Sequence, residues 1–435
     1  MGAKVLGTEE IIKNDYLDGM EPSRHILLFG AGKSATGLID FLTRQPGLFV
    51  TVVDAREETA LAKTKGAPGT RAVGLDVLAE AEKRLALVRE AGVVISLMPP
   101  TLHQLIASDC LSIGRHLLTA SYIDDAMRVL EPEVRAKGLL FLCEMGLDPG
   151  IDHMSAMSLL DGIRGEVLSF RSHCGGLVAP SSDDNPWHYK ISWNPRNVVL
   201  AGKAGARFRE AGVDRQVAYE ALFDPGRRVA IPGLGELAWY PNRDSLPYAS
   251  LYGLEHVPTF IRTTLRHPDF CKGWNKVIGL RLTDETPAYD TDGLSLAEFF
   301  RIHCPGAAPD EQMEYLGWND ATEINRGRCS AADVLQFALE TKLTLKEHDR
   351  DMVVMLHEIE YREQGGVKTI ASSLVVEGTD ATHTAMAKTV GLPLGIAAML
   401  LLEGRLKLRG LHIPTLPDIY TPVLERLERE GIAFT

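Results

Sequence analysis

The sequence predicts an α/β protein in which a Rossmann-type doubly wound parallel sheet is followed by an α+β domain with a mixed sheet. A glycine-rich turn joins a strand-like segment to a helix near residue 30, and strand-like and helix-like segments then alternate up to residue 150. After residue 150, strands with period-two alternation dominate. We therefore expect domains at 24–150 and 151–378, with a helical insert at about 281–350. Helices at 379–435 should pack back on the first domain.

The glycine-rich turn has the spacing of a dinucleotide-binding site. The strand-like segment "HILLFG" ends at Gly30, and Gly30, Gly32 and Ala35 follow the pattern G-x-G-x-x-A. In this pattern the first glycine allows a tight turn, the second lets a pyrophosphate approach the backbone, and the small third residue lets helix and strand pack closely. The N-terminus of the helix then faces the phosphates, with Lys33 and Ser34 beside them. The alternative is a tight turn whose glycines serve geometry alone.

A nucleoside-triphosphate P-loop is a poorer interpretation of the same turn. The letters "GKS" at 32–34 fit the end of that motif, but the motif needs a glycine five residues before Gly32, where Leu27 stands.

The second strand-like segment, "FVTVVDAR", bears on which nicotinamide cofactor would bind. Its Asp54 suits the ribose 2′-hydroxyl of NAD, whereas Arg56 could pair with the 2′-phosphate of NADP. Because a carboxylate at the tip of the strand repels a phosphate, the residues favour NAD slightly.

Ligands of parallel doubly wound sheets bind beyond the carboxyl ends of the strands. Four further strand-like segments are "RAVGLDV", "GVVISLMPP", "HLLTASYI" and "LLFLCEMG". Their ends supply the remaining candidate lining residues, which are Asp76, Leu97, Met98, Ser121, Tyr122, Gly146 and Asp148.

The second domain contains a candidate anion-binding surface. Period-two alternation in "FIRTTLRH" puts Arg262, Thr264 and Arg266 on one face of a strand. Guanidinium groups pair with carboxylates in bidentate fashion, so this face suits an acidic small molecule. The alternative is a solvated strand face with surface salt bridges.

Composition excludes several other classes of protein. The net charge of −12 argues against nucleic acid or an anionic membrane as a partner. The six cysteines form no C-x-x-C pair, so we expect neither a zinc site nor a redox dithiol, and we expect no metal. The N-terminal 20 residues fit neither a signal peptide nor a myristoylation site, and no apolar run approaches the roughly 18 residues of a membrane span. We therefore expect a cytoplasmic protein.

Together the motifs resemble those of one enzyme family. "GLDPGIDH", "SHCGGLVAP", "DNPWHYKISW", "YPNRDS", "RTTLR" and "AKTVGLP" occur in series and resemble saccharopine dehydrogenase of the glutamate-forming type, over about residues 25–430. The resemblance implies an NAD(P)-dependent oxidoreductase of lysine metabolism that acts on CH–NH bonds. It also implies a homodimer and interconversion of saccharopine with L-glutamate and 2-aminoadipate 6-semialdehyde.

Two other functions stay open beside this one. The related carboxynorspermidine-type dehydrogenases of polyamine synthesis share the implied architecture, and a non-catalytic NAD(P)-binding regulatory protein would share the first domain. A substrate with fewer carboxylates should need fewer arginines, so two inward-facing arginines would favour saccharopine.

The resemblance also implies roles for individual residues. Ser121, Tyr122 and Asp148 would contact the substrate from the first domain, and Arg243, Thr264, Leu265 and Arg266 would hold it from the second. Asp76, Leu97, Met98, Gly146 and Trp193 would line the cofactor. One departure concerns the cofactor: several relatives have a neutral residue where Asp54 stands and keep the arginine at 56, which fits NADP.

The implied chemistry needs a carboxylate and a proton acceptor. Oxidation of a secondary amine to an imine calls for a carboxylate near the developing positive charge, and Asp148 suits that role. Asp148 and Tyr122 are the candidate catalytic residues, with His173 and Cys174 as further candidates for the proton acceptor. Asp152 and His153, which follow in "GLDPGIDH", are expected to serve the helix that they begin.

Overall fold

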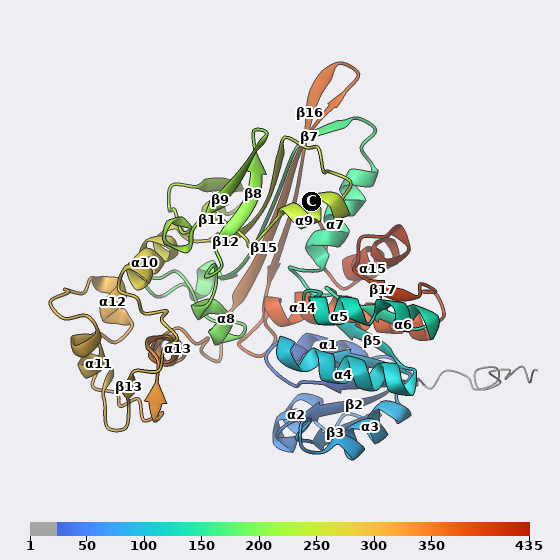
Figure 1. Ribbon diagram of the computed structural model, residues 1–435, viewed down its shortest axis with the longest axis horizontal. Helices are drawn as coiled ribbons and strands as arrows, with labels where there is room; N and C mark the ends of the chain where they lie inside the picture. The colour runs from blue at the N-terminus through green and yellow to red at the C-terminus, as the bar shows by residue number, and fades with distance from the viewer. Residues whose placement is uncertain (1–23) are drawn as a thin grey trace, which may run out of the picture.

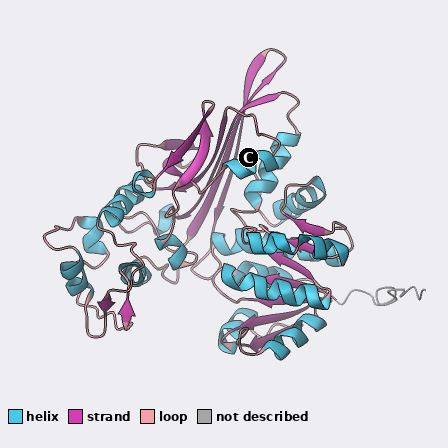
Figure 2. Cartoon of the chain, in the orientation of Figure 1, coloured by secondary structure: helices cyan, strands magenta, loops and turns pink. Residues whose placement is uncertain are grey.

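The computed structural model describes residues 24–435. The first domain is a parallel seven-stranded sheet with helices on both faces (Figures 1 and 2), in the strand order β17-β6-β5-β4-β1-β2-β3. Its strands are β1 (His25–Phe29), β2 (Phe49–Asp54), β3 (Thr70–Gly74), β4 (Val93–Ser96), β5 (His116–Thr119), β6 (Leu140–Leu142) and β17 (Gly410–His412). Its helices are α1 (Ala35–Thr43), α2 (Glu57–Thr64), α3 (Ala81–Glu90), α4 (Pro100–Ile113), α5 (Asp125–Val129) and α6 (Glu131–Ala136). The order 3-2-1-4-5-6 is that of a dinucleotide-binding fold, so the predicted fold class is confirmed.

Helix α7 (Ile151–Asp161) leads from the first domain into the second, which is built on a mixed sheet. The main path of this sheet is β10-β11-β12-β7-β15-β16, and β8 and β9 extend it beside β12. The strands are β7 (Glu166–Val178), β8 (Ala206–Glu210), β9 (Val213–Val217), β10 (Arg228–Ile231), β11 (Gly235–Pro241), β12 (Thr259–Arg266), β15 (Asp351–Glu363) and β16 (Gly366–Glu377). Strands β15 and β16 form an antiparallel hairpin, which projects from the top of the molecule in Figure 1.

Helices form an outlying lobe of the second domain, at the left of Figure 1. They are α10 (Pro268–Gly279), α11 (Leu296–His303), α12 (Glu311–Tyr315) and α13 (Ala331–Lys342), with the short strands β13 (Tyr289–Asp290) and β14 (Arg328–Cys329). Two shorter helices, α8 (Pro195–Val199) and α9 (Leu246–Leu251), connect the sheet strands. Within residues 281–350 lie the helices α11, α12 and α13 and the two short strands, whereas α10 precedes this range.

The C-terminal segment returns to the first domain, as predicted, through α14 (Ala385–Leu402) and α15 (Pro417–Arg429). Helix α14 packs very closely against α1. A Cβ added at Gly391 would stand only 2.5 Å from the Leu38 backbone nitrogen. Among the described residues, α14 is the one helix long and apolar enough to cross a membrane, but 83% of that stretch is buried inside the protein.

Two details differ from the sequence predictions. The segment 379–435 supplies a strand as well as helices, since β17 pairs with β6 at the edge of the sheet. An 18-residue apolar helix exists although no uninterrupted apolar run predicted one. The prediction about the N-terminal 20 residues lies outside the described part of the chain.

Candidate active site

Asp148 lies on a sharp turn that joins the last inner strand of the first domain to α7. Within this turn the Gly146 N–H donates to the Pro149 carbonyl, and a Cβ on Gly150 would stand only 2.1 Å from the Gly146 oxygen. Gly150 also has a φ of +148°, which L side chains rarely adopt. The glycines of "GLDPG" therefore let the chain turn back tightly and place Asp148 at the junction of the two domains.

Side chains from both domains hold the Asp148 carboxylate. The Tyr122 hydroxyl donates to Asp148 Oδ1 at 3.1 Å from the first domain. From the second domain, Arg262 Nη2 donates to the same oxygen at 2.8 Å and Asn242 Nδ2 donates to Oδ2 at 3.3 Å. The predicted pair Tyr122 and Asp148 is therefore in direct contact. Asn242, which follows β11, and Arg262 of β12 are two further partners of Asp148.

Arg262 is shared between two carboxylates. Its Nη2 also donates to Asp152 Oδ2 at 2.7 Å, and its guanidinium lies 4.3 Å from the centre of the Tyr248 ring. Burial raises the pKa of Asp148, against the attraction of Arg262. Burial also opposes ionisation of Asp152, but His153 and Arg262 together hold its pKa below the usual value. Asp152 therefore stays ionised, while Asp148 is the more readily protonated of the two.

A third acid, Glu144, is buried beside Asp148 and Asp152. Glu144 Oε2 is 2.9 Å from His153 Nε2, and the Tyr248 hydroxyl donates to it at 3.2 Å. His153 Nδ1 is 2.6 Å from the Tyr252 hydroxyl, and the imidazole is fully buried. The expectation that His153 serves the structure agrees with these contacts, and Asp152 has a larger role than capping α7.

Ser121 belongs to a chain of hydrogen bonds that runs back into the first domain. Its Oγ is 2.7 Å from His103 Nε2, and His103 Nδ1 is 2.8 Å from Ser96 Oγ. Burial lowers the pKa of His103 to about 4, so the imidazole is neutral near pH 7. A neutral imidazole donates through one nitrogen and accepts through the other, so His103 fixes the orientation of the Ser121 hydroxyl.

The glycine-rich turn has the shape that a dinucleotide needs. A Cβ on Gly30 would stand 2.8 Å from the Leu97 carbonyl oxygen, and Gly30 has a φ of +98°. A Cβ on Gly32 would meet nothing within 4 Å, so this side of the turn is open. The Ala31 N–H donates to Asp54 Oδ2 at 3.0 Å, which ties the turn to the tip of β2. These residues fit a nicotinamide dinucleotide whose pyrophosphate lies at Gly32 and whose ribose lies at Asp54.

The other predicted cofactor residues differ in their exposure to solvent. Lys33, Arg56 and Asp76 are exposed, Ser34, Leu97, Met98 and Trp193 are partly buried, and Ala35 and Gly146 are buried. Asp76 accepts from the N–H groups of Leu78 and Ala79 and so shapes its own turn. Trp193 packs against the cores of both domains, and its Nε1 donates to the Tyr189 hydroxyl at 3.0 Å.

The two predicted site arginines, Arg243 and Arg266, form no ion pair with a carboxylate of residues 24–435. The guanidinium of Arg243 lies 5.2 Å from the centre of the Tyr122 ring, and its backbone has a φ of +53°. Arg266 is 3% exposed and lies 5.2 Å from the Tyr189 ring centre, and its Nε has no hydrogen-bond partner. A buried charge without a counter-ion is costly, so Arg266 suits an anion that comes from outside the chain, whereas Arg243 is exposed to solvent.

Two further candidates are placed differently from the sequence prediction. Thr264 shares the face of Arg262 and Arg266, but the Leu265 side chain is fully buried in an apolar cluster on the opposite face. Leu265 can therefore offer only backbone atoms to a ligand on the arginine face. His173 also points to the opposite face, where its Nδ1 is 2.7 Å from Thr263 Oγ1 and its Nε2 is 3.1 Å from Glu358. His173 is accordingly a poor proton acceptor for chemistry at Asp148.

Cys174 and Tyr122 are poor bases for another reason. Burial raises the pKa of the Cys174 thiol and of the Tyr122 hydroxyl well above their usual values, and the negative charge of Asp148 adds to both shifts. Both groups are protonated near pH 7, which leaves Asp148 as the ionisable acceptor among the four candidates.

Sequence reasoning missed several residues that contact the candidates. Arg262 was placed on the correct strand face but was not linked to Asp148, and no signal singled out Asn242, Tyr248 or His103. Asn242 stands next to Arg243 in "YPNRDS", so the motif itself was the available signal. His103 lies on α4, where helical periodicity makes a buried histidine look like an ordinary core residue.

Comparison with known proteins agrees with this architecture. Residues 26–142 match the saccharopine dehydrogenase NADP-binding domain, and residues 146–432 match the saccharopine dehydrogenase C-terminal domain. An α-aminoadipic semialdehyde synthase of Arabidopsis thaliana is 32% identical over 94% of this chain and 44% of its own length. The chain thus spans less than half the length of this relative, and it spans 48% of the bovine mitochondrial protein of the same name.

A fungal relative matches over its whole length. Saccharopine dehydrogenase [NADP(+), L-glutamate-forming] of Saccharomyces cerevisiae is 33% identical over 93% of this chain and 97% of its own length. The apo structure of the histidine-tagged, L-Glu-forming enzyme from the same yeast superposes with a TM-score of 0.85 at 30% identity, covering 94% of this chain and 99% of that one. The sequence resemblance is therefore confirmed, and the chain belongs to the saccharopine dehydrogenase family.

Proposed function

We propose that this chain is an NAD(P)-dependent oxidoreductase that interconverts saccharopine with L-glutamate and 2-aminoadipate 6-semialdehyde. The observation that supports this most is the position of Asp148, held by Tyr122, Asn242 and Arg262 where the two domains meet. Arg243, which lies over the Tyr122 ring, and Arg266, which is buried with an unpartnered Nε, add positive charge that suits a substrate with three carboxylates.

The reaction breaks a C–H bond next to the secondary amine of saccharopine. A hydride leaves that carbon and a proton leaves the nitrogen, which gives a C=N bond; water then adds, and the C–N bond breaks to release glutamate. The bound nicotinamide supplies the hydride acceptor. In this scheme Asp148 stabilises the positive charge on nitrogen and accepts a proton, while Tyr122 and Arg262 fix its orientation.

The substrate carboxylates would be held from both domains. Arg243 and Arg266 provide guanidinium groups, Thr264 provides a hydroxyl, and Ser121 provides a hydroxyl whose direction His103 sets. Gly32 and the N-terminus of α1 would receive the pyrophosphate of the cofactor, and Asp54 its ribose.

The test is oxidation of NADH or NADPH in the presence of L-glutamate and 2-aminoadipate 6-semialdehyde. We expect turnover that needs both co-substrates and that falls at least tenfold in an Asp148→Asn variant. No turnover with either cofactor would contradict the proposal. In Arg266→Met we expect a higher KM for glutamate with cofactor affinity unchanged. If the substrate were instead a polyamine precursor with fewer carboxylates, its binding should depend on Arg243 or on Arg266 but not on both.

The choice between NAD and NADP is a separate proposal. The comparisons do not support the slight preference for NAD, because the matching family model and the yeast relative are both named for NADP. We propose that Asp54 sets the ratio of kcat/KM for NADPH to kcat/KM for NADH. Its carboxylate accepts from the Ala31 and Arg56 N–H groups at the place where a 2′-phosphate would come. Asp54→Ser should raise kcat/KM for NADPH relative to NADH, and Arg56→Ala should lower it. An unchanged ratio in both variants would contradict this role.

The remaining expectations concern the assembly and its place in the cell. We propose a homodimer, which sedimentation of the purified chain at several concentrations would test. A cytoplasmic location is likewise a proposal, and fractionation of the source cells would test it.

A further inference from the structure

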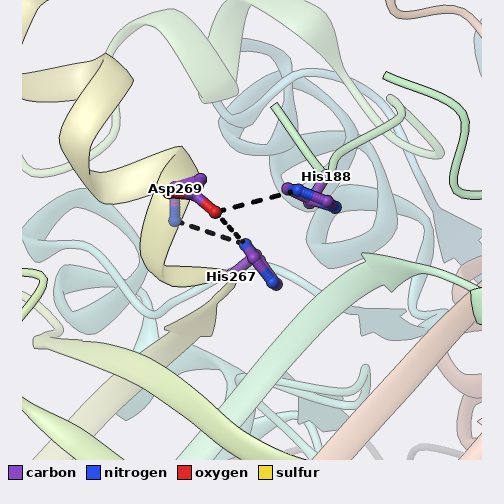
Figure 3. A group of neighbouring side chains, drawn as sticks. All are labelled: His188, His267 and Asp269. Atoms are coloured by element: carbon purple, nitrogen blue, oxygen red, sulfur yellow. Dashed lines mark hydrogen bonds and ion pairs between the residues drawn. The ribbon is translucent and has the colours of Figure 1, made fainter. Parts of the chain in front are cut away.

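A cluster of metal-ligating side chains lies outside the site around Asp148. Figure 3 shows His188, from the loop that follows β7, beside His267 and Asp269 at the start of α10. One ligand atom from each residue lies within 4.8 Å of the other two, and all three residues are partly exposed. The two imidazole rings are close together, with their centroids 3.9 Å apart and their planes tilted by 33°.

The hydrogen bonds around the cluster show which ring nitrogens donate and which accept. Asp183 Oδ2 lies 2.7 Å from His188 Nδ1, and a carboxylate only accepts, so this nitrogen carries the hydrogen. In the neutral ring His188 Nε2 then has a lone pair, and it faces Asp269 Oδ2 at 3.8 Å. His267 Nδ1 accepts from the Asp269 N–H and lies 3.4 Å from the same Oδ2.

The three ligand atoms lie close enough together to share one ion, since each is within 4.8 Å of the other two. A cation at their centre would replace the Asp269 N–H as the partner of His267 Nδ1.

We propose that His188, His267 and Asp269 bind one divalent transition-metal ion such as Zn²⁺, with water completing its coordination. Two imidazoles and one carboxylate form a common ligand set for this class of ion. Asp183 is placed as the second-layer carboxylate that orients a ligating histidine. Lys272 binds Asp269 Oδ1 at 2.6 Å and leaves Oδ2 for the ion, although its charge weakens the site.

The position of the cluster indicates what the ion would do. His188 directly precedes Tyr189, and His267 directly follows Arg266, whose guanidinium lies over the Tyr189 ring. A bound ion would tie the loop to the start of α10 and so hold Tyr189 and Arg266 together. It would stabilise the chain and fix one wall of the proposed carboxylate pocket, without taking part in the reaction at Asp148.

The experiment uses the full chain with any affinity tag removed and metals stripped by chelation. Calorimetric titration with Zn²⁺ and spectroscopic titration with Co²⁺ should each give one ion per chain, and Zn²⁺ should raise the melting temperature. His188→Ala and His267→Ala should abolish this binding. Asp183→Asn should weaken it about 10- to 100-fold, as removal of second-layer partners does elsewhere.

His383→Ala is the matched control. His383 is exposed and lies between two acids, Asp380 and Asp40, but it has no second imidazole beside it. This variant should bind Zn²⁺ with unchanged affinity. Zn²⁺ binding that survives both His188→Ala and His267→Ala, or a chain that binds no ion at millimolar Zn²⁺, would overturn the proposal. Neither result depends on the proposed activity, so the two can fail separately.

Discussion

Arg262 and Asp148 form an ion pair across the domain junction, with 2.8 Å between Arg262 Nη2 and Asp148 Oδ1. Arg262 belongs to β12 of the second domain, and Asp148 to the turn before α7 in the first. The arginine also pairs with Asp152 at 2.7 Å, so one guanidinium offsets two carboxylates in a buried place. The bond therefore joins the two domains at the residue proposed to act on the substrate.

Removal of the arginine should destabilise the chain strongly. An Arg262→Met variant leaves two buried carboxylates without their cation, and breaking a buried pair in this way typically costs about 3–5 kcal/mol. We expect the free energy of unfolding, measured by urea titration, to fall by that order.

Asp148→Asn is the comparison for this variant, because the amide keeps a hydrogen-bond acceptor for Arg262 and Tyr122. We expect nearly unchanged stability and a large loss of turnover. A variant pair in which Arg262→Met unfolds no more easily than Asp148→Asn would show that Arg262 does not stabilise the junction.

Features that depend on residues close together in the sequence were predicted, whereas features that depend on contacts between distant segments were missed. The tip of β2 at Asp54 and the turn at Gly30 depend on neighbours in sequence, so spacing and periodicity located them. The pairing of Arg262 with Asp148 joins segments 114 residues apart, and no local pattern encodes it. Strand β17 has three residues and forms only because β6 offers a free edge, so its pattern is too short to recognise.

His103 should act on substrate binding through Ser121. In His103→Ala the Ser121 hydroxyl loses its 2.7 Å partner, and one hydrogen bond between neutral groups is worth about 0.5–1.5 kcal/mol. We expect KM for the amino-acid substrate to rise up to about tenfold, with a smaller change in kcat. Because the pKa of His103 is about 4, the pH profile between pH 6 and 9 should keep its shape.

His116→Ala is the control for this effect. His116 is a second histidine of the same domain whose pKa burial lowers to about 4, and its Nδ1 accepts from the Leu140 N–H within the sheet. This variant should lose stability and keep its KM. Equal increases of KM in both variants would mean that His103 acts only through the stability of the domain.

Stability should fall as the solution is acidified from pH 6.5 to 4. Burial lowers the pKa of His103, His116 and His357 to about 4 in the folded chain, against 6.5 for an ordinary histidine. In this window the unfolded chain binds more protons, so each histidine contributes stability that is complete above pH 6.5 and is lost towards pH 4. The slope is at most about 1.4 kcal/mol per pH unit for each histidine.

The measurement is the free energy of unfolding in urea at intervals between pH 7 and 4.5. His357→Gln should reduce the slope, because it removes a fully buried imidazole that has one nitrogen without a partner. An identical slope in the variant and in the original chain would show that His357 does not contribute to it.

The crossing of α1 and α14 should tolerate no added methyl group. A Cβ on Gly391 would stand 2.5 Å from Leu38 N, and one on Gly395 would stand 2.6 Å from Phe41 Cδ1. Alanine favours a helix by about 1 kcal/mol over glycine, but overpacking a tight contact costs about 1–3 kcal/mol. Since the nearest atom to Gly391 is backbone and cannot rotate away, we expect Gly391→Ala to lower the melting temperature. Gly279→Ala in α10, where a Cβ would meet nothing within 4 Å, should leave it unchanged or raise it. If both variants were equally stable, close packing would not explain the glycine in α14.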